Sequence, residues 1–508
     1  MCVWRCLARA CRVVGYLQTN EVLDTALSDA RATFFRFGHF VLFVFRMLHH
    51  HQIPPSGTHH HPTYSQFNQP TYRTLTYSQL ADHFNAYGAN RFAQRYLVDD
   101  SKFIPGGPIF AFTGAEGGDV TRLVGDYGTP AALAKSLGGV VLYMECRFFG
   151  KSIPVANVTG ARTSLGLLSV EQILRDYIAL ITDYRDAVCG TPCADSKIVT
   201  FGGSLAGTLS ALMRIRAPWL IHASWASSTP LFGFVNEPKI NQYAWRKQVT
   251  DNWKDLGTSA GYPHCVDHVR SGFAALSSAS PAAVASAFHT CEAPFEGNSN
   301  AVQGIVWGLL EGSGEFVYPE STSPIPNHCK AMSSKATNES GLTIFASLIN
   351  AGPSSPCLNL THHGKPSEAG IAWNYMACTE VIHPIGSNNV TDFFPPGKWS
   401  VASLTHDCWQ SMKVIPQPMV LPQAYGFTNG VRSLKKHATR IMFAYGTRDP
   451  WARLGVGYTN LSSQLPVVVI EGGSHCADTA SAREEDTKAM KAAREQEARI
   501  ITAWLKEE

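Results

Sequence analysis

The sequence predicts an α/β fold, in which helices cover both faces of a mostly parallel sheet and a helical cap is inserted into the chain. Short apolar runs typical of buried strands alternate with segments of helical periodicity in the first and last parts of the sequence. Between residues 230 and 370, by contrast, helical segments are separated by loops rich in proline and serine. We therefore expect one sheet domain built from two separated parts of the chain.

The pattern assigns a role to each part of the chain in order. We interpret residues 1–63 as an N-terminal targeting and low-complexity segment, followed by the first part of the sheet domain at 64–229. The cap is expected at 230–370, and the sheet domain resumes over 371–508. The predicted buried strands lie at 106–112, 139–144, 198–203, 223–228, 440–445 and 466–470, and amphipathic helices are predicted at 168–184 and 482–505.

One turn stands out because it carries a serine between a strand and a helix. Four β-prone or apolar residues run into Gly202 and Gly203, and Ser204 is followed by small residues and an apolar helical run. A strand, a sharp turn and a helix in the pattern Gly-x-Ser-x-Ala indicate a nucleophile elbow, in which small neighbours let the helix approach the strand closely. The alternative is a glycine-rich turn with an incidental serine.

The last two predicted strands each end in a loop that offers a partner for this serine. Asp449 follows the first of them and His475 follows the second, at the sheet edge where open α/β sheets place their sites. A serine hydroxyl needs an imidazole to take its proton, and the imidazole needs a carboxylate to hold its tautomer. Asp449 could instead be only a turn former, Asp407 or Asp478 could be the acid, and His475 could merely cap a loop.

Two backbone regions are expected to stabilise a negatively charged oxygen in the transition state. The first is the N–H group of Leu205, directly after the serine. The second is the glycine-rich loop after the strand at 106–112, formed by Gly114, Ala115, Glu116 and Gly117.

The composition limits the class of protein and indicates the cellular compartment in which it folds. The 508 residues are 45% hydrophobic and 16% charged, with a net charge of +3, so no basic surface argues for nucleic acid as a partner. Of 13 cysteines, three lie within the first eleven residues, and the remaining ten are compatible with disulfides. Asn-x-Ser/Thr sequons begin at Asn157, Asn338, Asn359, Asn389 and Asn460. Together these features favour the secretory route, with a secreted or lysosome-like destination.

The N-terminal segment is atypical for a secreted protein. Its apolar run at 37–45 could be a signal core placed unusually far into the chain, and it is too short to span a bilayer, so we expect no firm membrane anchor. An incorrectly assigned start codon would explain the segment equally well. Histidines at 49–51 and 59–61 lie in a proline-bearing linker with nothing to fix ligand geometry, so no metal site and no cofactor are predicted.

Several separate motifs resemble one family of serine peptidases. They are Asp82-His-Phe84, Phe92-Ala-Gln-Arg-Tyr96, Gly114-Ala-Glu-Gly117, Glu145-Cys-Arg-Phe-Phe-Gly150, the serine elbow, Trp373-Asn-Tyr-Met-Ala-Cys-Thr-Glu380, Asp449-Pro-Trp451 and Ser474-His-Cys-Ala-Asp478. The sequence from about residue 79 to 505 resembles the family of lysosomal Pro-Xaa carboxypeptidase, dipeptidyl peptidase II and thymus-specific serine protease. Ala206 and the ending His-Cys-Ala-Asp are more similar to the thymus-specific branch.

The resemblance implies an α/β-hydrolase with a helical cap and exopeptidase activity after proline or a small residue. It places Ser204, Asp449 and His475 in the triad, and Trp451 either in the wall of the substrate pocket or as a core aromatic behind the acid. Three departures affect rate and specificity: Cys146 replaces the histidine of Glu-His-Arg, Met376 replaces a glutamine, and Leu205 replaces a tyrosine. Cys146 is not expected to be a nucleophile, because burial would raise its pKa.

We therefore predict a serine exopeptidase that acts on short peptides without a cofactor, and a homodimer is one option for its oligomeric state, which the sequence does not determine. One alternative is an esterase or lipase on the same scaffold. The other is a catalytically inactive binding protein, favoured by the changes at Leu205 and Cys146. Whether peptides would be trimmed from the amino or the carboxyl end depends on which charged terminus the cap recognises.

Overall fold

A single eight-stranded sheet forms the centre of the protein. The computed structural model describes residues 72–507 apart from 115, 156–163, 234–239, 336–339, 351–356 and 361–366, so the segment 1–63 lies outside the described residues. The sheet has the order β1-β2-β4-β3-β5-β6-β7-β8. Its strands are β1 (Arg73–Leu80), β2 (Arg91–Asp99), β3 (Ile109–Phe112), β4 (Val140–Met144), β5 (Ile198–Gly203), β6 (Ile221–Ser227), β7 (Ile441–Gly446) and β8 (Val467–Ile470).

The predicted mostly parallel sheet is confirmed. Strand β2 pairs antiparallel with both β1 and β4, whereas the five remaining neighbouring pairs from β4 to β8 are parallel. Every residue of β4 and of β5 is buried. Strands covered on both faces need apolar side chains in both directions, which explains why these segments read as continuous apolar runs.

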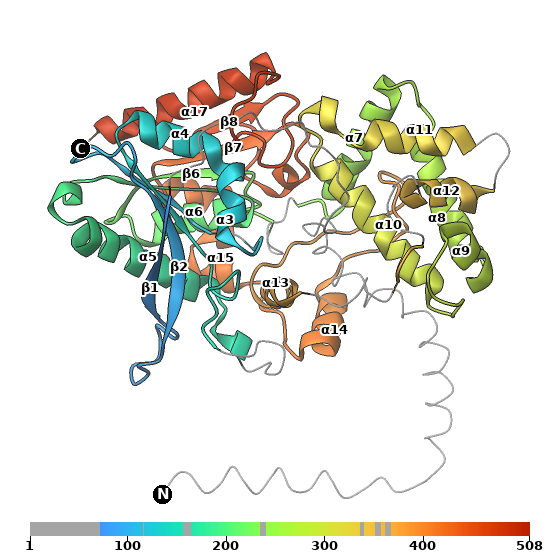
Figure 1. Cartoon of the computed structure of the whole chain (residues 1–508), viewed down its shortest axis with the longest axis horizontal. Helices are drawn as coiled ribbons and strands as arrows, with labels where there is room; N and C mark the ends of the chain where they lie inside the picture. The colour runs from blue at the N-terminus through green and yellow to red at the C-terminus, as the bar shows by residue number, and fades with distance from the viewer. Residues whose placement is uncertain are drawn as a thin grey trace, which may run out of the picture.

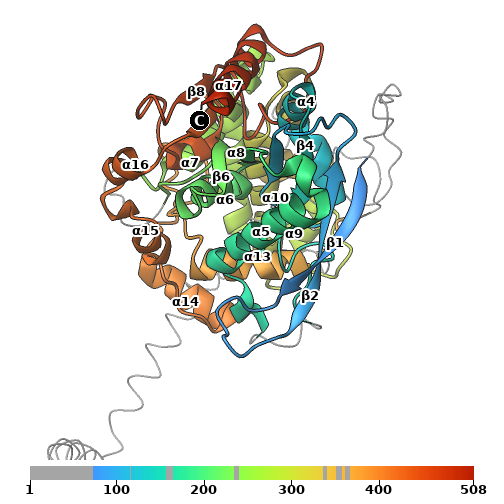
Figure 2. The ribbon, with the colours of Figure 1, turned by 90° about the vertical axis from the view of Figure 1, so that its left-hand side faces the viewer.

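Helices cover the two faces of the sheet (Figure 2). Helices α5 (Val170–Asp183) and α6 (Leu205–Arg216) contribute to the hydrophobic cluster on one face. Helices α4 (Gly128–Ser136) and α17 (Lys488–Lys506) contribute to the cluster on the other. The sequence of α5 explains its start and its packing: the Ser169 hydroxyl caps the helix by accepting from the Gln172 N–H, and Ile173, Tyr177 and Ile181 recur at four-residue spacing and are fully buried.

Two of the motifs that carry the family resemblance form a buried ionic network rather than a site. The Arg147 guanidinium donates to both carboxylate oxygens of Asp176 at 2.7 and 2.6 Å, and the side chains of both residues are fully buried. The ring of His83 contacts the same carboxylate at 2.8 Å. Arg147 also donates to the carbonyl oxygens of Leu80 and Ala81. This network fixes the end of β1 against α5.

The cap is a helical unit with its own hydrophobic cluster, on the right-hand side of Figure 1. Its helices are α7 (Ala244–Ser259), α8 (Cys265–Ser278), α9 (Pro281–Phe288), α10 (Asn298–Glu315), α11 (Ile325–Lys335) and α12 (Gly341–Asn350). A buried ion pair joins Arg246 of α7 to Glu311 of α10 at 2.9 Å. The predicted helical character of this stretch is therefore observed in its described residues.

Strands return later than the sequence pattern indicates. From residue 371 we expected strand and helix to alternate again, but the structure has α13 (Glu368–Thr379), α14 (Val401–Met412), α15 (Val420–Ala424) and α16 (Val431–His437) before β7. The apolar residues of this stretch pack into two different cores, so they do not repeat along the sequence with one helical period. Met376 packs in the sheet-domain cluster, whereas Phe393 and Phe394 pack in the cap cluster.

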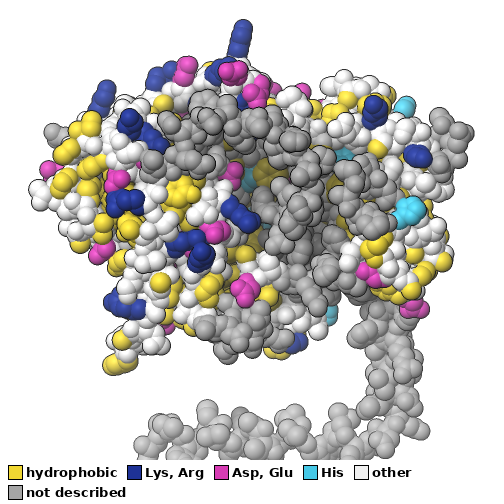
Figure 3. Space-filling model, in the orientation of Figure 1, with side chains coloured by type: hydrophobic (Ala, Val, Ile, Leu, Met, Phe, Trp, Pro, Cys, Tyr) yellow, Lys and Arg dark blue, Asp and Glu magenta, His cyan; other side chains and the backbone are white. Residues whose placement is uncertain are grey.

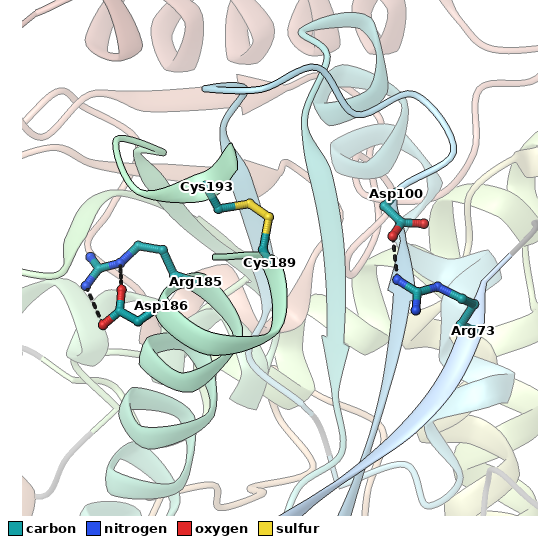
Figure 4. Close-up of a disulfide and its surroundings, with 6 residues drawn as sticks. All are labelled: Arg73, Asp100, Arg185, Asp186, Cys189 and Cys193. Atoms are coloured by element: carbon teal, nitrogen blue, oxygen red, sulfur yellow. Dashed lines mark hydrogen bonds and ion pairs between the residues drawn. A yellow bond between two sulfur atoms is a disulfide. The ribbon is translucent and has the colours of Figure 1, made fainter. Parts of the chain in front are cut away.

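Four disulfides cross-link the described chain. Cys265–Cys329 and Cys291–Cys357 lie in the cap, Cys378–Cys408 joins α13 to α14, and Cys189–Cys193 closes a short loop after α5 (Figure 4). Cys146 and Cys476 are free, so eight of the ten cysteines considered in the sequence are paired. Within the described residues, no helix combines the length and apolar character needed to cross a bilayer. Figure 3 shows Lys and Arg side chains interspersed with Asp and Glu on one face.

The cap disulfide should contribute more to stability than the short-loop disulfide. Cys265–Cys329 joins residues 64 apart in sequence, whereas Cys189–Cys193 joins residues 4 apart. Chain-entropy arguments give a cost of about 4 kcal/mol for losing the first and about 2 kcal/mol for losing the second. The double variants Cys265→Ala/Cys329→Ala and Cys189→Ala/Cys193→Ala can be compared by denaturant unfolding, and equal losses would contradict this origin of stability.

Candidate active site

Ser204 lies on a strained turn between β5 and α6. Its φ of 59° and ψ of −126° lie outside the regions that L-residues normally adopt. Its backbone N–H donates to the carbonyl oxygen of Ser227 on β6 at 3.0 Å, which fixes the turn to the neighbouring strand. The turn has the strand, sharp bend and helix that the sequence predicts.

Small residues around the turn are required by close backbone contacts. A Cβ atom at Gly202 would lie 2.5 Å from the backbone of Ala206, and one at Gly207 would lie 2.5 Å from the carbonyl oxygen of Ser227. Ala206 is itself fully buried, so its methyl group fits where the common motif has glycine. Helix α6 can therefore start directly above the end of β5.

The imidazole of His475 is hydrogen-bonded to Asp449. His475 Nδ1 lies 3.0 Å from Asp449 Oδ1, and the two residues are 6% and 0% exposed. Asp449 caps the short helix η7 (Pro450–Leu454), where the same oxygen accepts from the Trp451 N–H at 2.9 Å. The other two acids considered lie elsewhere: Asp478 accepts from the Ser227 hydroxyl at 2.6 Å, and Asp407 lies within α14. Asp449 is thus the aspartate that contacts the ring.

The loop of His475 lies against the serine turn. The Cys476 N–H donates to the Ser228 hydroxyl at 2.9 Å, and a Cβ atom at Gly203 would lie 2.6 Å from the Cys476 sulfur. Among the described residues, no hydrogen bond joins the Ser204 hydroxyl to the His475 imidazole. His475 Nε2 instead lies 3.6 Å from Glu315 Oε1, at the end of the cap helix α10.

The surroundings of His475 favour its protonated form. Burial lowers the pKa of His475, but the charge of the Asp449 carboxylate and the hydrogen bonds to Asp449 and to the Cys476 sulfur oppose this effect and raise the pKa. Burial also raises the pKa of the Cys476 thiol, which therefore stays neutral near pH 7.

The expected oxyanion donors lie in elements that contact each other. Leu205 is the first residue of α6, so its N–H has no acceptor within the helix. The end of β3 is tied to the elbow, because the Thr113 hydroxyl donates to the Ala206 carbonyl oxygen at 2.6 Å. Gly114 follows with a φ of 58°, and Glu116 and Gly117 lie in the turn beyond it, whereas Ala115 is outside the described residues. Their role as donors stays a prediction.

Trp451 connects the acid loop to the cap. Its indole N–H donates to Glu315 Oε1 at 2.7 Å, and its ring lies 5.9 Å from that of His475 and 5.6 Å from that of Trp245 on α7. It therefore lies beside His475 and also packs against the cap core, while a place in the wall of a substrate pocket stays a prediction.

The free cysteines lie in surroundings that disfavour a thiolate. Burial raises the pKa of Cys146 far above its usual value, which argues against a thiolate nucleophile there. No group of three or more His, Cys, Asp or Glu side chains suited to a metal ion occurs in the part of the chain that the structure describes.

Comparison with known proteins matches the chain to one peptidase family. The sequence profile described as serine carboxypeptidase S28 matches residues 79–497. Human lysosomal Pro-X carboxypeptidase is 28% identical over 459 residues, covering 86% of this chain and 89% of that protein. Human thymus-specific serine protease is 27% identical over 468 residues, covering 84% and 86%. The family resemblance expected from the motifs is confirmed.

The close approach of Cys476 to Gly203 can be tested by a pair of substitutions. Gly203→Ala would place its methyl group within 2.6 Å of the Cys476 sulfur. We expect overpacking to lower the free energy of unfolding by about 1–3 kcal/mol. The same substitution should cost less in a Cys476→Ala background, because the sulfur is gone. Denaturant unfolding of the four proteins measures the coupling, and an equal cost in both backgrounds would show that the sulfur lies elsewhere.

Proposed function

We propose that this chain, which belongs to the serine carboxypeptidase S28 family, hydrolyses short peptides through an acyl-enzyme on Ser204. Membership of this family makes the protein a serine-type peptidase. The proposal assigns Ser204 as the nucleophile, His475 as the base and Asp449 as the group that orients the base. The observation that carries it is the 3.0 Å bond between His475 Nδ1 and Asp449, on a loop that contacts the serine turn.

The proposed reaction uses the two nitrogens of His475 differently. Asp449 accepts from Nδ1, so Nε2 can take the proton of the Ser204 hydroxyl as its oxygen attacks the scissile carbonyl carbon. The N–H of Leu205 and a donor from residues 114–117 would stabilise the oxyanion, at about 3 kcal/mol each. His475 then protonates the leaving amine, and water releases the acyl group by the reverse proton transfers. The bond between Ser204 and Nε2 would close when substrate binds, since catalytic hydrogen bonds are often loose without it.

The cap supports a preference for short peptides. The amide nitrogen of Asn252 on α7 donates to the carbonyl oxygen of Gly314 in α10 at 2.7 Å and to that of Arg448 beside the acid at 2.8 Å. This contact holds the cap against the catalytic loops, where it would exclude folded substrates. Cleavage after proline or a small residue is proposed by analogy with the Pro-X specificity in the relative's name.

We also propose delivery by the secretory route, to a secreted or lysosome-like destination. The four disulfides suit an oxidising compartment, and several relatives are named as lysosomal. Asn389 is exposed in the sequence Asn-Val-Thr, and we propose it as a glycosylation site. Asn460 is also exposed, but its side-chain oxygen accepts from the Val467 N–H at 2.7 Å.

Labelling by a fluorophosphonate tests the nucleophile directly. The probe should label the folded wild-type protein, and Ser204→Ala should abolish both labelling and hydrolysis of a proline-containing dipeptide amide. Ser277→Ala, which changes a serine on the cap helix α8, is the control and should behave as wild type. Turnover of acyl esters without any amide hydrolysis would favour the esterase alternative, and absence of labelling in the folded wild-type protein would favour a binding protein.

The pH dependence of kcat/KM tests the assignment of His475. Because Asp449 helps to raise the pKa of His475, the imidazole stays protonated at a pH where an ordinary histidine is neutral. A protonated imidazole cannot act as a base, so activity should fall as the pH decreases through a value above about 6.5. Asp449→Asn should lower kcat by about 10⁴ and move this acid limb to lower pH. An acid limb that does not respond to the substitution would argue against the pairing.

A further inference from the structure

A pair of buried acids lies behind the catalytic loops and has no part in the proposed reaction. Asp478 follows His475 on the same loop, and Glu497 lies on helix α17; they are 1% and 0% exposed. Both carboxyl oxygens of Glu497 are buried, and no N–H or O–H group in the described part of the chain donates to either of them. An ionised carboxylate without a donor is costly inside a protein.

Asp478 links this pair of acids to the proposed nucleophile and base. Its Oδ1 accepts from the Ser227 hydroxyl at 2.6 Å, and the carbonyl oxygen of Ser227 accepts from the Ser204 N–H at 3.0 Å. Within the loop, the Ala477 N–H donates to the carbonyl oxygen of Ser474 at 3.3 Å, on the other side of His475. A displacement of the Asp478 side chain would therefore disturb both the serine turn and the loop of the base.

One arginine of α17 holds this loop but does not balance the charge of its acids. Arg494 donates to the carbonyl oxygens of Ala477 and Asp478 at 3.0 and 2.9 Å, and its guanidinium pairs with the buried carboxylate of Asp486. The carboxylates of Asp478, Asp486 and Glu497 beside one guanidinium would leave two negative charges uncompensated. One added proton removes one of these charges.

The other titratable groups around the pair do not supply a positive charge to it. The Cys476 thiol shares the loop of Asp478, and its pKa is raised, so it stays neutral near pH 7. The Tyr318 hydroxyl donates to Asp486 at 2.9 Å. On strand β6 beneath α17, His222 contacts the carbonyl oxygen of Trp504, close to the C-terminal end of the helix.

From this arrangement we infer that Glu497 is a positioning residue, which carries a proton in the active enzyme and donates it in a hydrogen bond to Asp478. The inference rests on the proposed function. A hydrogen bond from a carboxylic acid to a carboxylate is short and strong. It would hold Asp478 against α17 and keep its other oxygen in place to accept from Ser227.

The electrostatics of the pair favour this proton. Burial, the charge of Asp478 and hydrogen bonding between the two carboxyl groups raise the pKa of Glu497 well above its usual value, against the opposing charge of Arg494. Burial raises the pKa of Asp478 as well, although the bond from Ser227 and the charge of Arg494 oppose this effect. Two acids in such contact titrate as a unit, so the pair keeps one shared proton well above the pH at which an ordinary carboxyl group ionises.

Loss of the shared proton would weaken both stability and activity. In the unfolded chain, Glu497 ionises near a pH of about 4.3. The stability that it contributes is thus complete below that pH and is lost as the pH rises through the higher pKa of the folded state. Two buried carboxylates would then repel each other and displace the loop of His475. A lysosome-like compartment would keep the pair protonated.

Two substitutions at Glu497 separate the proton from the shape of the side chain. Glu497→Gln keeps an N–H donor toward Asp478 and cannot ionise. We expect its kcat for a proline-containing dipeptide amide to stay close to wild type at the pH optimum, and the alkaline fall of kcat to move up by at least one pH unit. Glu497→Leu has no donor, so a misplaced base should lower kcat by about 10²-fold with little change in KM.

The matched control is Glu495→Gln on the same helix, where the side chain of Glu495 is 71% exposed and lies 3.8 Å from Arg499. It should keep the wild-type kcat and the wild-type alkaline limb. The proton itself can be observed without activity. An infrared difference spectrum between wild type and Glu497→Gln at pH 7 should show the C=O band of a protonated carboxyl group, and this measurement is informative even if the leucine variant does not fold.

The possible failures of the inference are distinguishable. If Glu497→Gln keeps the wild-type alkaline limb, or the infrared band is absent, Glu497 does not hold the proton and the inference is wrong, while the serine peptidase assignment stands. If both variants lower the free energy of unfolding but fluorophosphonate labels Ser204 at the wild-type rate at every pH, Glu497 is only structural. If folded wild-type protein is neither labelled nor active, the proposed function fails and the inference fails with it.

Discussion

The strained backbone at Ser204 is the constraint on which the rest of the site depends. Holding a non-glycine residue at a φ of 59° costs about 1–3 kcal/mol, and the surrounding packing has to maintain it. The glycines at 202 and 207 leave no space between α6 and the ends of β5 and β6, and the Ser204 N–H is fixed to Ser227. Because β7 and β8 continue the same parallel sheet, the loops that follow them lie at the same edge as the Ser204 turn.

The cap is part of this site rather than a separate cover. Asn252 links α7, the end of α10 and the acid loop through two hydrogen bonds from one amide nitrogen. Beyond α10, the Tyr318 N–H donates to the hydroxyl of Ser474, the residue before the base. The segment from Gly314 to Tyr318 is therefore held against both catalytic loops. Any movement of the cap would change the surroundings of His475 directly.

The sequence predicted those features that depend on local pattern. The strands, the elbow and the order of Ser204, Asp449 and His475 follow from apolar runs, small residues and motif order. Glu315 could not be found in this way, because it ends an ordinary cap helix and meets His475, 160 positions later, only through the fold. The helices α13 to α16 were also hidden, since the apolar residues of this stretch are divided between two cores.

In this chain, some residues that identify the family lie outside the candidate active site. Arg147 and His83 belong to motifs that identify the family, yet both serve the buried carboxylate of Asp176 and hold β1 against α5. The number of cysteines also overestimates the number of disulfides. Cys146 and Cys476 lie in different packed environments, and neither has a thiol partner among the described residues. The motifs thus indicate which residues are important more readily than they indicate what each residue contacts.

The sheet domain and the cap contribute different groups to the candidate site. The sheet domain places Ser204, Asp449 and His475 on neighbouring loops at one edge. The cap adds a negative charge beside the imidazole. In this chain that charge is the Glu315 carboxylate at the end of α10, 3.6 Å from the base. Because Glu315 also accepts from the Trp451 indole N–H, a shift of α10 relative to the sheet domain would change the contacts of both His475 and Trp451.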